Sequence, residues 1–309
     1  MTIHMSFARC SRFFSPALVF RNHAYSSLNR RTSHSKLPFN FFSITSMASA
    51  ASVGTAQFPV TPYTPTYDTW PYNPSDFTRY DENDDGVFYR QPRLVTHIDD
   101  PSIARLTEYY ATVLPKLGKI MDMCTSWKSF YPRETEQAVQ NQALEIYGVG
   151  LNAEEMELNG ALKEWRVLDL NQSPHDVREG WKDDKGLRFD AVTCVVSIDY
   201  LVKPLEICRN LLDAMNEGGK VHLVISNRCF PNKVVRRWMT LSEQARLELV
   251  GDYLHFAGWS DVEIVDLCAK DDSGMRVTDD HGTVLIRSPH LPDHLDPLWV
   301  VRGTKRTGM

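Results

Sequence analysis

The sequence has no uninterrupted apolar run long enough to cross a membrane as a helix. Such a helix needs roughly 18–20 consecutive apolar residues, and no run in the 309 residues approaches that length. The sequence also lacks any C-x-x-C pair, since its six cysteines are Cys10, Cys124, Cys194, Cys208, Cys229 and Cys268. These absences predict no integral membrane association, no zinc site and no disulfide framework. The histidines His281, His290 and His294 are too scattered to predict a metal site.

Acidic residues are absent from the first 67 positions, which carry five arginines and Lys36. A Ser-, Arg- and Phe-rich segment without acids is typical of an organelle transit peptide, which we expect over 1–54. Residues 21–31 resemble a mitochondrial presequence, and 47–54 resemble a plastid peptide or a second start site. A mitochondrion is therefore slightly preferred over a chloroplast, and translation from Met47 would give a cytoplasmic protein. A disordered tail with no address is the alternative interpretation.

The remainder of the chain is acidic. Residues 68–309 contain 28 basic and 39 acidic residues, a net charge of −11. Because such a surface repels phosphate backbones, we expect no nucleic-acid partner. The sequence does not predict the oligomeric state.

Residues 55–95 are rich in Pro and Tyr and show no clear period. Their aromatic content favours an arm laid over a domain, because free linkers rarely carry so many aromatic residues. Within this arm, "DENDDG" at residues 81–86 matches the first half of a calcium loop. The twelfth position of such a loop requires a bidentate Glu and is Pro92 here. A solvated acidic turn is the favoured interpretation.

Strands and helices alternate over residues 96–309, which we expect to form one domain. A helix begins at Asp99 or Asp100 with Pro101 in its first turn. Strands are expected over 119–123, 145–151, 166–170, 189–197, 220–226, 262–267 and 298–303. Further helices are expected over 133–143 and 153–159, from Pro204 to a stop at Gly218-Gly219, and in two parts over 233–257 with a capping box at Thr240 and Glu243. This pattern predicts an α/β fold, a Rossmann-like doubly wound, mostly parallel sheet ending in an antiparallel hairpin.

The turn after the first strand lacks the glycines of a nucleotide-binding loop. In "KIMDMCTSWKSFYP", residues 119–132, the strand reaches Asp122 and continues as Cys124-Thr125-Ser126-Trp127-Lys128. A ligand of an open α/β sheet lies at the carboxyl ends of the strands, near the switch point. The residues to examine are therefore those that follow the first four strands, namely 124–127, Asn152, 169–171 and 197–200.

Two blocks resemble class I S-adenosylmethionine-dependent methyltransferases, particularly the type 11 branch. The block "FDAVTCVVSIDYLVKPLEICRNLLDAMNEGGKVHLVISNRCFP", residues 189–231, is similar to strand four, its helix and strand five of that family. The block "DPLWVVRGTK", residues 296–305, resembles its last antiparallel strand. The likeness covers about residues 95–305. It implies the class I fold, S-adenosylmethionine as cofactor, and methyl transfer to a small-molecule or lipid-like acceptor.

The resemblance also implies which residues hold the cofactor. In the family, glycines let the first loop approach the methionine part of the donor, whereas this chain has Cys124, Ser126 and Lys128 there. The acid that binds the ribose corresponds to Gly150, with Asn152 as a possible substitute. Asp169 matches the acid that faces the adenine amino group. The implied cofactor site consists of Asp122, Cys124, Thr125, Ser126, Asn152, Asp169, Leu170 and Ser197.

Three residues are candidates for catalysis. Methyl transfer requires a positioned acceptor, exclusion of water and, for a protonated nucleophile, a base. Asp199 and Tyr200 follow the fourth strand, and His97 lies where the arm could cover the site. Each has a structural alternative, since Asp199 can cap a turn, Tyr200 can pack in the core and His97 can bond a nearby Asp. His222 alternates within strand five and is interpreted as a core histidine.

Two other functions remain open at this stage. A non-catalytic descendant that keeps the fold as a binding or regulatory module is favoured by the altered first loop. A nucleotide-dependent oxidoreductase is less consistent with the sequence, because no G-x-G-x-x-G follows the first strand.

Overall fold

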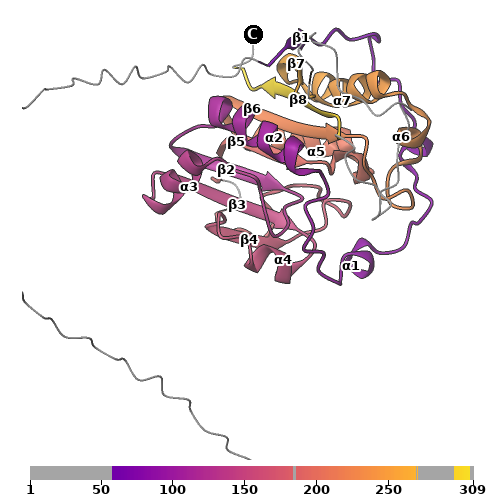
Figure 1. Cartoon of the computed structure of the whole chain (residues 1–309). Helices are drawn as coiled ribbons and strands as arrows, with labels where there is room; N and C mark the ends of the chain where they lie inside the picture. Colours follow the sequence, from indigo (N-terminus) through magenta and orange to yellow (C-terminus); the bar gives the residue numbers. More distant parts are fainter. Residues whose placement is uncertain (1–57, 184–185, 269, 271–295, 307–309) are drawn as a thin grey trace, which may run out of the picture. The chain divides into compact units, whose positions relative to one another are not determined.

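The computed structural model describes residues 58–183, 186–268, 270 and 296–306 (Figure 1). Its strands are β1 (Val60–Pro62), β2 (Gly118–Met123), β3 (Leu144–Gly150), β4 (Glu164–Val167), β5 (Phe189–Val195), β6 (Met215–Ser226), β7 (Ser260–Asp266) and β8 (Leu298–Thr304). Its α-helices are α1 (Asp85–Phe88), α2 (Asp100–Val113), α3 (Arg133–Gln140), α4 (Ala153–Glu157), α5 (Pro204–Ala214), α6 (Arg236–Thr240) and α7 (Glu243–Ala257), with short 3₁₀ helices η1 (Pro74–Phe77) and η2 (Ile198–Tyr200). The leader predicted over 1–54 and the three loop histidines fall outside the described residues.

All eight strands form one sheet in the order β1-β7-β8-β6-β5-β2-β3-β4, which reads from top to bottom in Figure 1. Strands β6, β5, β2, β3 and β4 are mutually parallel, whereas β8 pairs antiparallel with both β6 and β7. The predicted α/β sheet, mostly parallel and ending in an antiparallel hairpin, is therefore confirmed. The sheet is Rossmann-like and doubly wound, as the sequence predicted.

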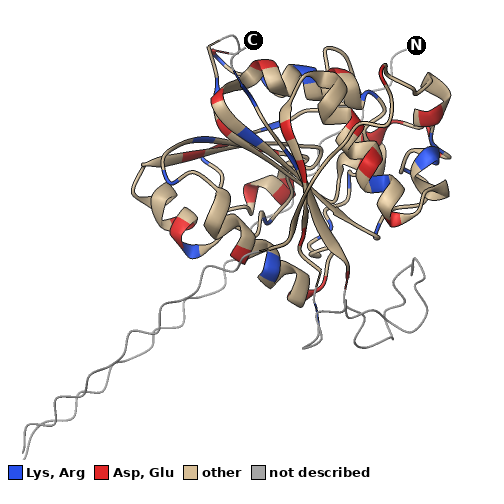
Figure 2. Cartoon of the chain, turned by 90° about the horizontal axis from the view of Figure 1, so that it is seen from above, with Lys and Arg blue, Asp and Glu red and all other residues tan. Residues whose placement is uncertain are grey.

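The centre of the sheet is covered on both faces. Successive side chains of β2 point to opposite sides, so Ile120 packs in the cluster that includes α2 and Met121 packs in the cluster that includes α5 and α7. Both are fully buried, and each contributes about 1.5–3 kcal/mol by leaving water. Figure 2 shows helices on both sides of the twisted sheet, with acidic and basic residues interspersed. Among the described helices, none is long and apolar enough to cross a bilayer.

Two predicted helix boundaries are wrong. Helix α5 ends at Ala214, and Gly218 and Gly219 lie inside β6 rather than at a helix stop. A Cβ at Gly219 would lie 2.9 Å from the carbonyl oxygen of Asn216, so the close backbone path there requires glycine. Helix α7 is capped by Ser242, whose hydroxyl accepts from the Ala245 amide, and the predicted Thr240–Glu243 box does not form.

The arm, predicted as irregular, contains a strand. Strand β1 pairs antiparallel with β7 and extends the sheet by one strand at its edge. Beyond it, the hydroxyls of Tyr63 and Tyr72 both donate to the carboxylate of Asp252 in α7. The arm then runs down the right side of Figure 1 to α1. It is thus fixed to the domain by backbone pairing and by side-chain hydrogen bonds.

The acidic turn of the arm is a structural anchor rather than an exposed loop. Asp84 caps α1, and the buried Asp85 pairs with Arg79 at 2.7 Å and with the fully buried Lys233 at 3.0 Å. Burial opposes ionisation of Asp85, but hydrogen bonds from Arg79, Asn171 and Lys233 lower its pKa below the ordinary value. The predicted solvated turn is therefore corrected in part, because Asp85 faces inward and joins the arm to the loop after β6.

Candidate functional site

A cavity of about 550 Å³ lies at the carboxyl ends of β2, β3, β4 and β5. Its wall is formed by the arm from Asp85 to His97, the loop after β2, the start of α4, and the segments that follow β4, β5 and β6. Trp127 and Lys128, which are bulky residues at the entrance, line this cavity without filling it. The place where an open α/β sheet binds its ligand is therefore hollow.

The loop after β2 is held by a buried carboxylate. Asp122 accepts hydrogen bonds from the hydroxyls of Thr125 at 2.5 Å, Ser129 at 2.6 Å and Thr193 at 3.1 Å. Burial raises the pKa of Asp122 to about 6, although the three hydroxyls oppose the shift. Cys124 adopts a left-handed backbone with φ of 56°, a conformation that costs roughly 1–2 kcal/mol without glycine. Hydroxyl groups thus hold the turn after β2.

Gly150 ends β3 because the loop after β2 leans against it. A Cβ at Gly150 would lie 2.2 Å from the carbonyl oxygen of Thr125, and the Thr125 amide donates to Val149 at 2.8 Å. No side chain fits at this position. The loop itself therefore excludes an acidic side chain at position 150.

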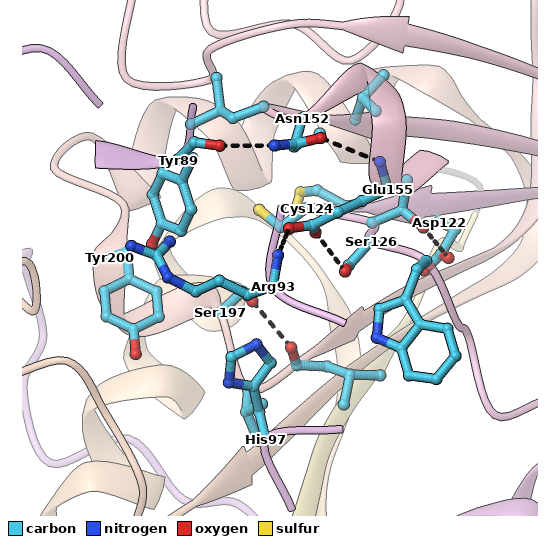
Figure 3. Close-up of a pocket in the computed structure, with 18 of the residues that line it drawn as sticks. Tyr89, Arg93, His97, Asp122, Cys124, Ser126, Asn152, Glu155, Ser197 and Tyr200 are labelled. Atoms are coloured by element: carbon cyan, nitrogen blue, oxygen red, sulfur yellow. Dashed lines mark hydrogen bonds between the residues drawn. The ribbon is translucent and has the colours of Figure 1, made fainter. Parts of the chain in front are cut away.

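Asn152 fixes the arm and caps α4. Its amide nitrogen donates to the carbonyl oxygens of Tyr89 at 2.8 Å and Arg90 at 3.2 Å, and its oxygen accepts from the Glu155 amide at 3.0 Å. Figure 3 shows this run of bonds from Tyr89 through Asn152 to Glu155. Both amide hydrogens are used by the arm, so the predicted donation to a ribose hydroxyl is not available in this arrangement. This corrects the role expected for Asn152.

Glu155 is a cavity residue that the sequence interpretation missed. One carboxylate oxygen accepts from the Ser126 hydroxyl at 2.5 Å and the other from the Arg93 amide at 2.6 Å. The Trp127 indole also donates to the arm, at the Val95 carbonyl, at 3.0 Å. The available signal was positional, because Glu155 stands three residues after the helix-capping Asn152. Together these bonds join the loop, α4 and the arm over one half of the cavity.

The segments after β4 and β5 leave more of their polar groups available. Asp169 lines the cavity, and its Oδ1 accepts from the Asn171 amide at 2.9 Å. Among the described residues, no hydrogen bond reaches its Oδ2. Leu170 and Ser197 also line the cavity, and the Ser197 hydroxyl donates to the Val195 carbonyl at 2.8 Å. Asp169 is therefore a carboxylate at the cavity wall with one oxygen uncommitted.

Tyr200 and His97 lie at the cavity wall, as the sequence predicted. The Tyr200 hydroxyl accepts from the Phe230 amide at 2.9 Å, and its ring lies 6.0 Å from that of Phe230. Burial raises the pKa of Tyr200 well above 10.0, so its hydroxyl keeps the proton and can donate it in a hydrogen bond. His97 lies in the arm with its ring 5.6 Å from Phe230. These two candidates are thus brought together around one aromatic ring.

Asp199 is not among the described residues that line the cavity, and its catalytic role stays a prediction. Its side chain is buried in the 3₁₀ helix η2, and its Oδ2 has no hydrogen-bond partner. Burial raises its pKa to about 7, and Arg246 opposes the shift.

Metal ligands do not gather in the described part of the chain. No group of three His, Cys, Asp or Glu residues there is arranged to hold an ion. Core residue His222 contacts the Tyr109 hydroxyl through Nδ1 at 2.8 Å, but its buried Nε2 has no partner. Burial lowers the pKa of His222 to about 3, so the ring is neutral. The interpretation of His222 as a core histidine holds for its position, while only one of its nitrogens is satisfied.

The chain matches no protein-family model and no curated protein by sequence. Solved structures to which it is similar include a SAM-dependent methyltransferase from Archaeoglobus fulgidus, at 11% identity and a TM-score of 0.44, covering 67% of this chain and 95% of that one. Haemonchus contortus phosphoethanolamine N-methyltransferase 2 with S-adenosylhomocysteine has 14% identity and a TM-score of 0.40, covering 67% and 52%. The [4+2]-cyclase SpnF has 14% identity and a TM-score of 0.41, covering 66% and 82%. The likeness concerns the fold alone, which does not define the chemistry.

Proposed function

We propose that this chain is an S-adenosylmethionine-dependent methyltransferase acting on a small-molecule or lipid-like substrate. The observation that carries the proposal is the cavity of about 550 Å³ at the switch point of a class I sheet. Its volume lies within the roughly 300–1,000 Å³ of small-molecule and cofactor sites. The uncommitted oxygen of Asp169 stands at its wall, where the resemblance implies the adenine amino group. The residues present therefore fit the donor at the adenine end.

The proposal assigns the adenosyl group to Asp169, Leu170 and Ser197, and the methionine part to the loop of Cys124, Thr125 and Ser126. When bound, the donor supplies an electrophilic methyl group on a sulfonium. The chain's own residues exclude water with the arm and orient the acceptor. Tyr200 donates a hydrogen bond to the acceptor, and His97 is the side chain placed to accept its proton.

Calorimetry on the full chain with S-adenosylmethionine, S-adenosylhomocysteine and NAD tests this function. Heat with the first two ligands supports it, and heat with NAD alone would identify a nucleotide-dependent oxidoreductase. Absence of heat with all three would favour a non-catalytic module. Mass spectrometry of small molecules that co-purify with the protein then gives the acceptor.

The non-catalytic alternative is favoured by one observation. Asn152 and Gly150, which occupy the ribose-binding end of β3, are committed to the arm and to the loop. A chain that binds S-adenosylhomocysteine but transfers no methyl group to any co-purified compound would support this second function. A methylated product with the mass increase of one methyl group would exclude it.

Targeting of the chain to an organelle belongs to the same proposal. The leader predicted over 1–54 supports a mitochondrion before a chloroplast. Expression of the chain fused to a fluorescent protein, beginning at Met1 or at Met47, tests this. Organelle signal that is lost in the shorter form supports a transit peptide, and diffuse signal from both would contradict it.

A further inference from the structure

Arg93 is a cation at the cavity wall that has no carboxylate partner among the described residues. Arg93 lies in the arm, and its guanidinium carbon is 4.5 Å from the ring centroid of Phe88, 5.6 Å from that of Tyr89 and 5.4 Å from that of Phe230. Figure 3 shows its side chain extending from Glu155 towards Tyr89. The guanidinium therefore reaches the part of the cavity formed by the arm and the loop after β6.

The polar contacts of this guanidinium are few. Its Nη2 donates to the Phe88 carbonyl at 3.0 Å, while Nη1 is shielded from solvent and has no hydrogen-bond partner. No carboxylate within the described residues lies within ion-pair distance of it. An arginine presents five N–H donors, and the two on the buried Nη1 have no acceptor among the described residues. A shielded cation of this kind is costly unless an anion pairs with it.

Three nearby cationic side chains differ from Arg93 because each is paired with a carboxylate. Arg79 and Lys233 are buried and both pair with Asp85. Arg228, which also lines the cavity, pairs with Asp296 at 2.5 Å. Arg93 is the exception in this set, and it is the one whose guanidinium is surrounded by aromatic rings. Rings hold the guanidinium plane in place through cation–π attraction, which pre-organises it for a planar anion.

We propose that Arg93 binds the carboxylate or phosphate group of the methyl acceptor, which is a small acid whose apolar body lies against Tyr89 and Phe230. Identifying this ligand as the methyl acceptor rests on the proposed function, whereas the binding of an anion by Arg93 does not. Arginine pairs with carboxylates and phosphates through two parallel hydrogen bonds. The methionine carboxylate of the donor has the same chemistry. The guanidinium contacts the arm and Phe230 rather than the loop after β2, and this favours the acceptor as the source.

The test uses benzoate and its neutral analogue benzamide as probes, titrated into the full chain by calorimetry. The wild-type protein should bind benzoate more tightly than benzamide. In Arg93→Met the benzoate affinity should fall at least about tenfold, while benzamide affinity stays within about twofold. The matched control is Arg90→Met, because Arg90 is an exposed arm residue that is not among the residues lining the cavity. This control should keep the preference for benzoate.

A second titration distinguishes the two sources of the anion. S-adenosylhomocysteine carries the methionine carboxylate, and 5′-methylthioadenosine lacks it. If Arg93 serves the acceptor, Arg93→Met binds both adenosyl compounds as the wild type does. A loss confined to S-adenosylhomocysteine would move the contact to the donor and overturn the proposal.

The remaining outcomes are equally decisive. Equal benzoate affinity in the wild type and in Arg93→Met, or no preference of the wild type for benzoate over benzamide, would overturn the anion site. Retained benzamide binding and an unchanged melting temperature show that the variant is folded. If no adenosyl compound binds while the benzoate preference is lost in Arg93→Met, the anion site stands and the methyl-transfer function fails.

Discussion

The two halves of the cavity differ in how their polar groups are used. At the ends of β2 and β3, Asp122, Asn152 and Glu155 are committed to hydrogen bonds within the protein. At the ends of β4 and β5, Asp169 keeps one oxygen uncommitted beside Leu170 and Ser197. Hydrogen bonds inside the protein compete with hydrogen bonds to a ligand. We therefore infer that the half at the ends of β4 and β5 binds the ligand, whereas the half at the ends of β2 and β3 holds the arm in place.

The largest expected effect on stability comes from the hydrogen bonds within the half of the cavity at the ends of β2 and β3. Asp122→Ala leaves three hydroxyls without their acceptor, and we expect a loss of about 2–4 kcal/mol in the free energy of unfolding. Thr193→Val, which removes one of the three donors, should cost about 1 kcal/mol. Urea denaturation measures both. A change below 0.5 kcal/mol (roughly the scatter of surface substitutions) in Asp122→Ala would show that the loop does not depend on this carboxylate.

The buried carboxyl group of Asp199, which follows β5, should make the free energy of unfolding depend on pH. Burial raises the pKa of Asp199 to about 7 in the folded protein, so the folded state binds a proton that the unfolded state releases near pH 4. The stabilisation from this neutral form is present at low pH and is lost as pH rises through about 7. Asp199→Asn cannot lose a proton and should gain about 1–3 kcal/mol relative to the wild type between pH 4 and 8. Parallel stability curves for the two proteins would contradict this.

A variant of Asn152 distinguishes two roles of this residue, which are holding the arm and binding a ribose. Asn152→Ser keeps a helix cap but loses both bonds to the arm, and we expect about 1 kcal/mol less stability and faster proteolysis near residues 89–95. Ser242→Ala, which removes a cap without touching the arm, should cost a similar amount and leave the arm protected. If Asn152→Ser instead weakened S-adenosylhomocysteine binding at unchanged stability, the half at the ends of β2 and β3 would also recognise the ligand.

The smallest expected effect concerns the residues before the arm. Deleting 1–57 should change the melting temperature by less than about 2 °C, because the sequence of these residues shows no periodic apolar face. The deletion boundary matters, since Phe58 is buried and the Pro59 carbonyl accepts from Asp266. Deleting 1–62 should lower the melting temperature clearly, because it also removes β1 and its pairing with β7. Equal melting of both deletions would indicate that β1 adds no stability.

Much of the fold followed from the sequence, because apolar runs such as 145–151 and 189–197 are read directly as buried strands. Strand β1 did not, since its three residues are exposed and gain their place by pairing with β7. The end of α5 was placed too late because a Gly-Gly pair is an equally good signal for a bend within a strand.

The sequence predicted where the site lies better than it predicted the hydrogen bonds and burial of its residues. Fold logic placed Cys124, Asp169 and Tyr200 at the cavity, because residues after parallel strands share one edge of the sheet. The hydrogen bonds from Asn152 to the arm depend on where the arm crosses the strand ends. No local sequence pattern predicts that crossing. Burial of Asp199 likewise depends on packing between segments far apart in the sequence.

The central claim is that the cavity receives the adenosyl group of the donor at Asp169. Titration of S-adenosylhomocysteine into the wild type and Asp169→Ala, with Glu206→Ala as an exposed control, tests it directly. We predict measurable binding to the wild type and the control, and an affinity weakened in Asp169→Ala by about 1–3 kcal/mol, roughly 5- to 150-fold. Equal affinity in all three proteins, or no binding to the wild type, would contradict the account.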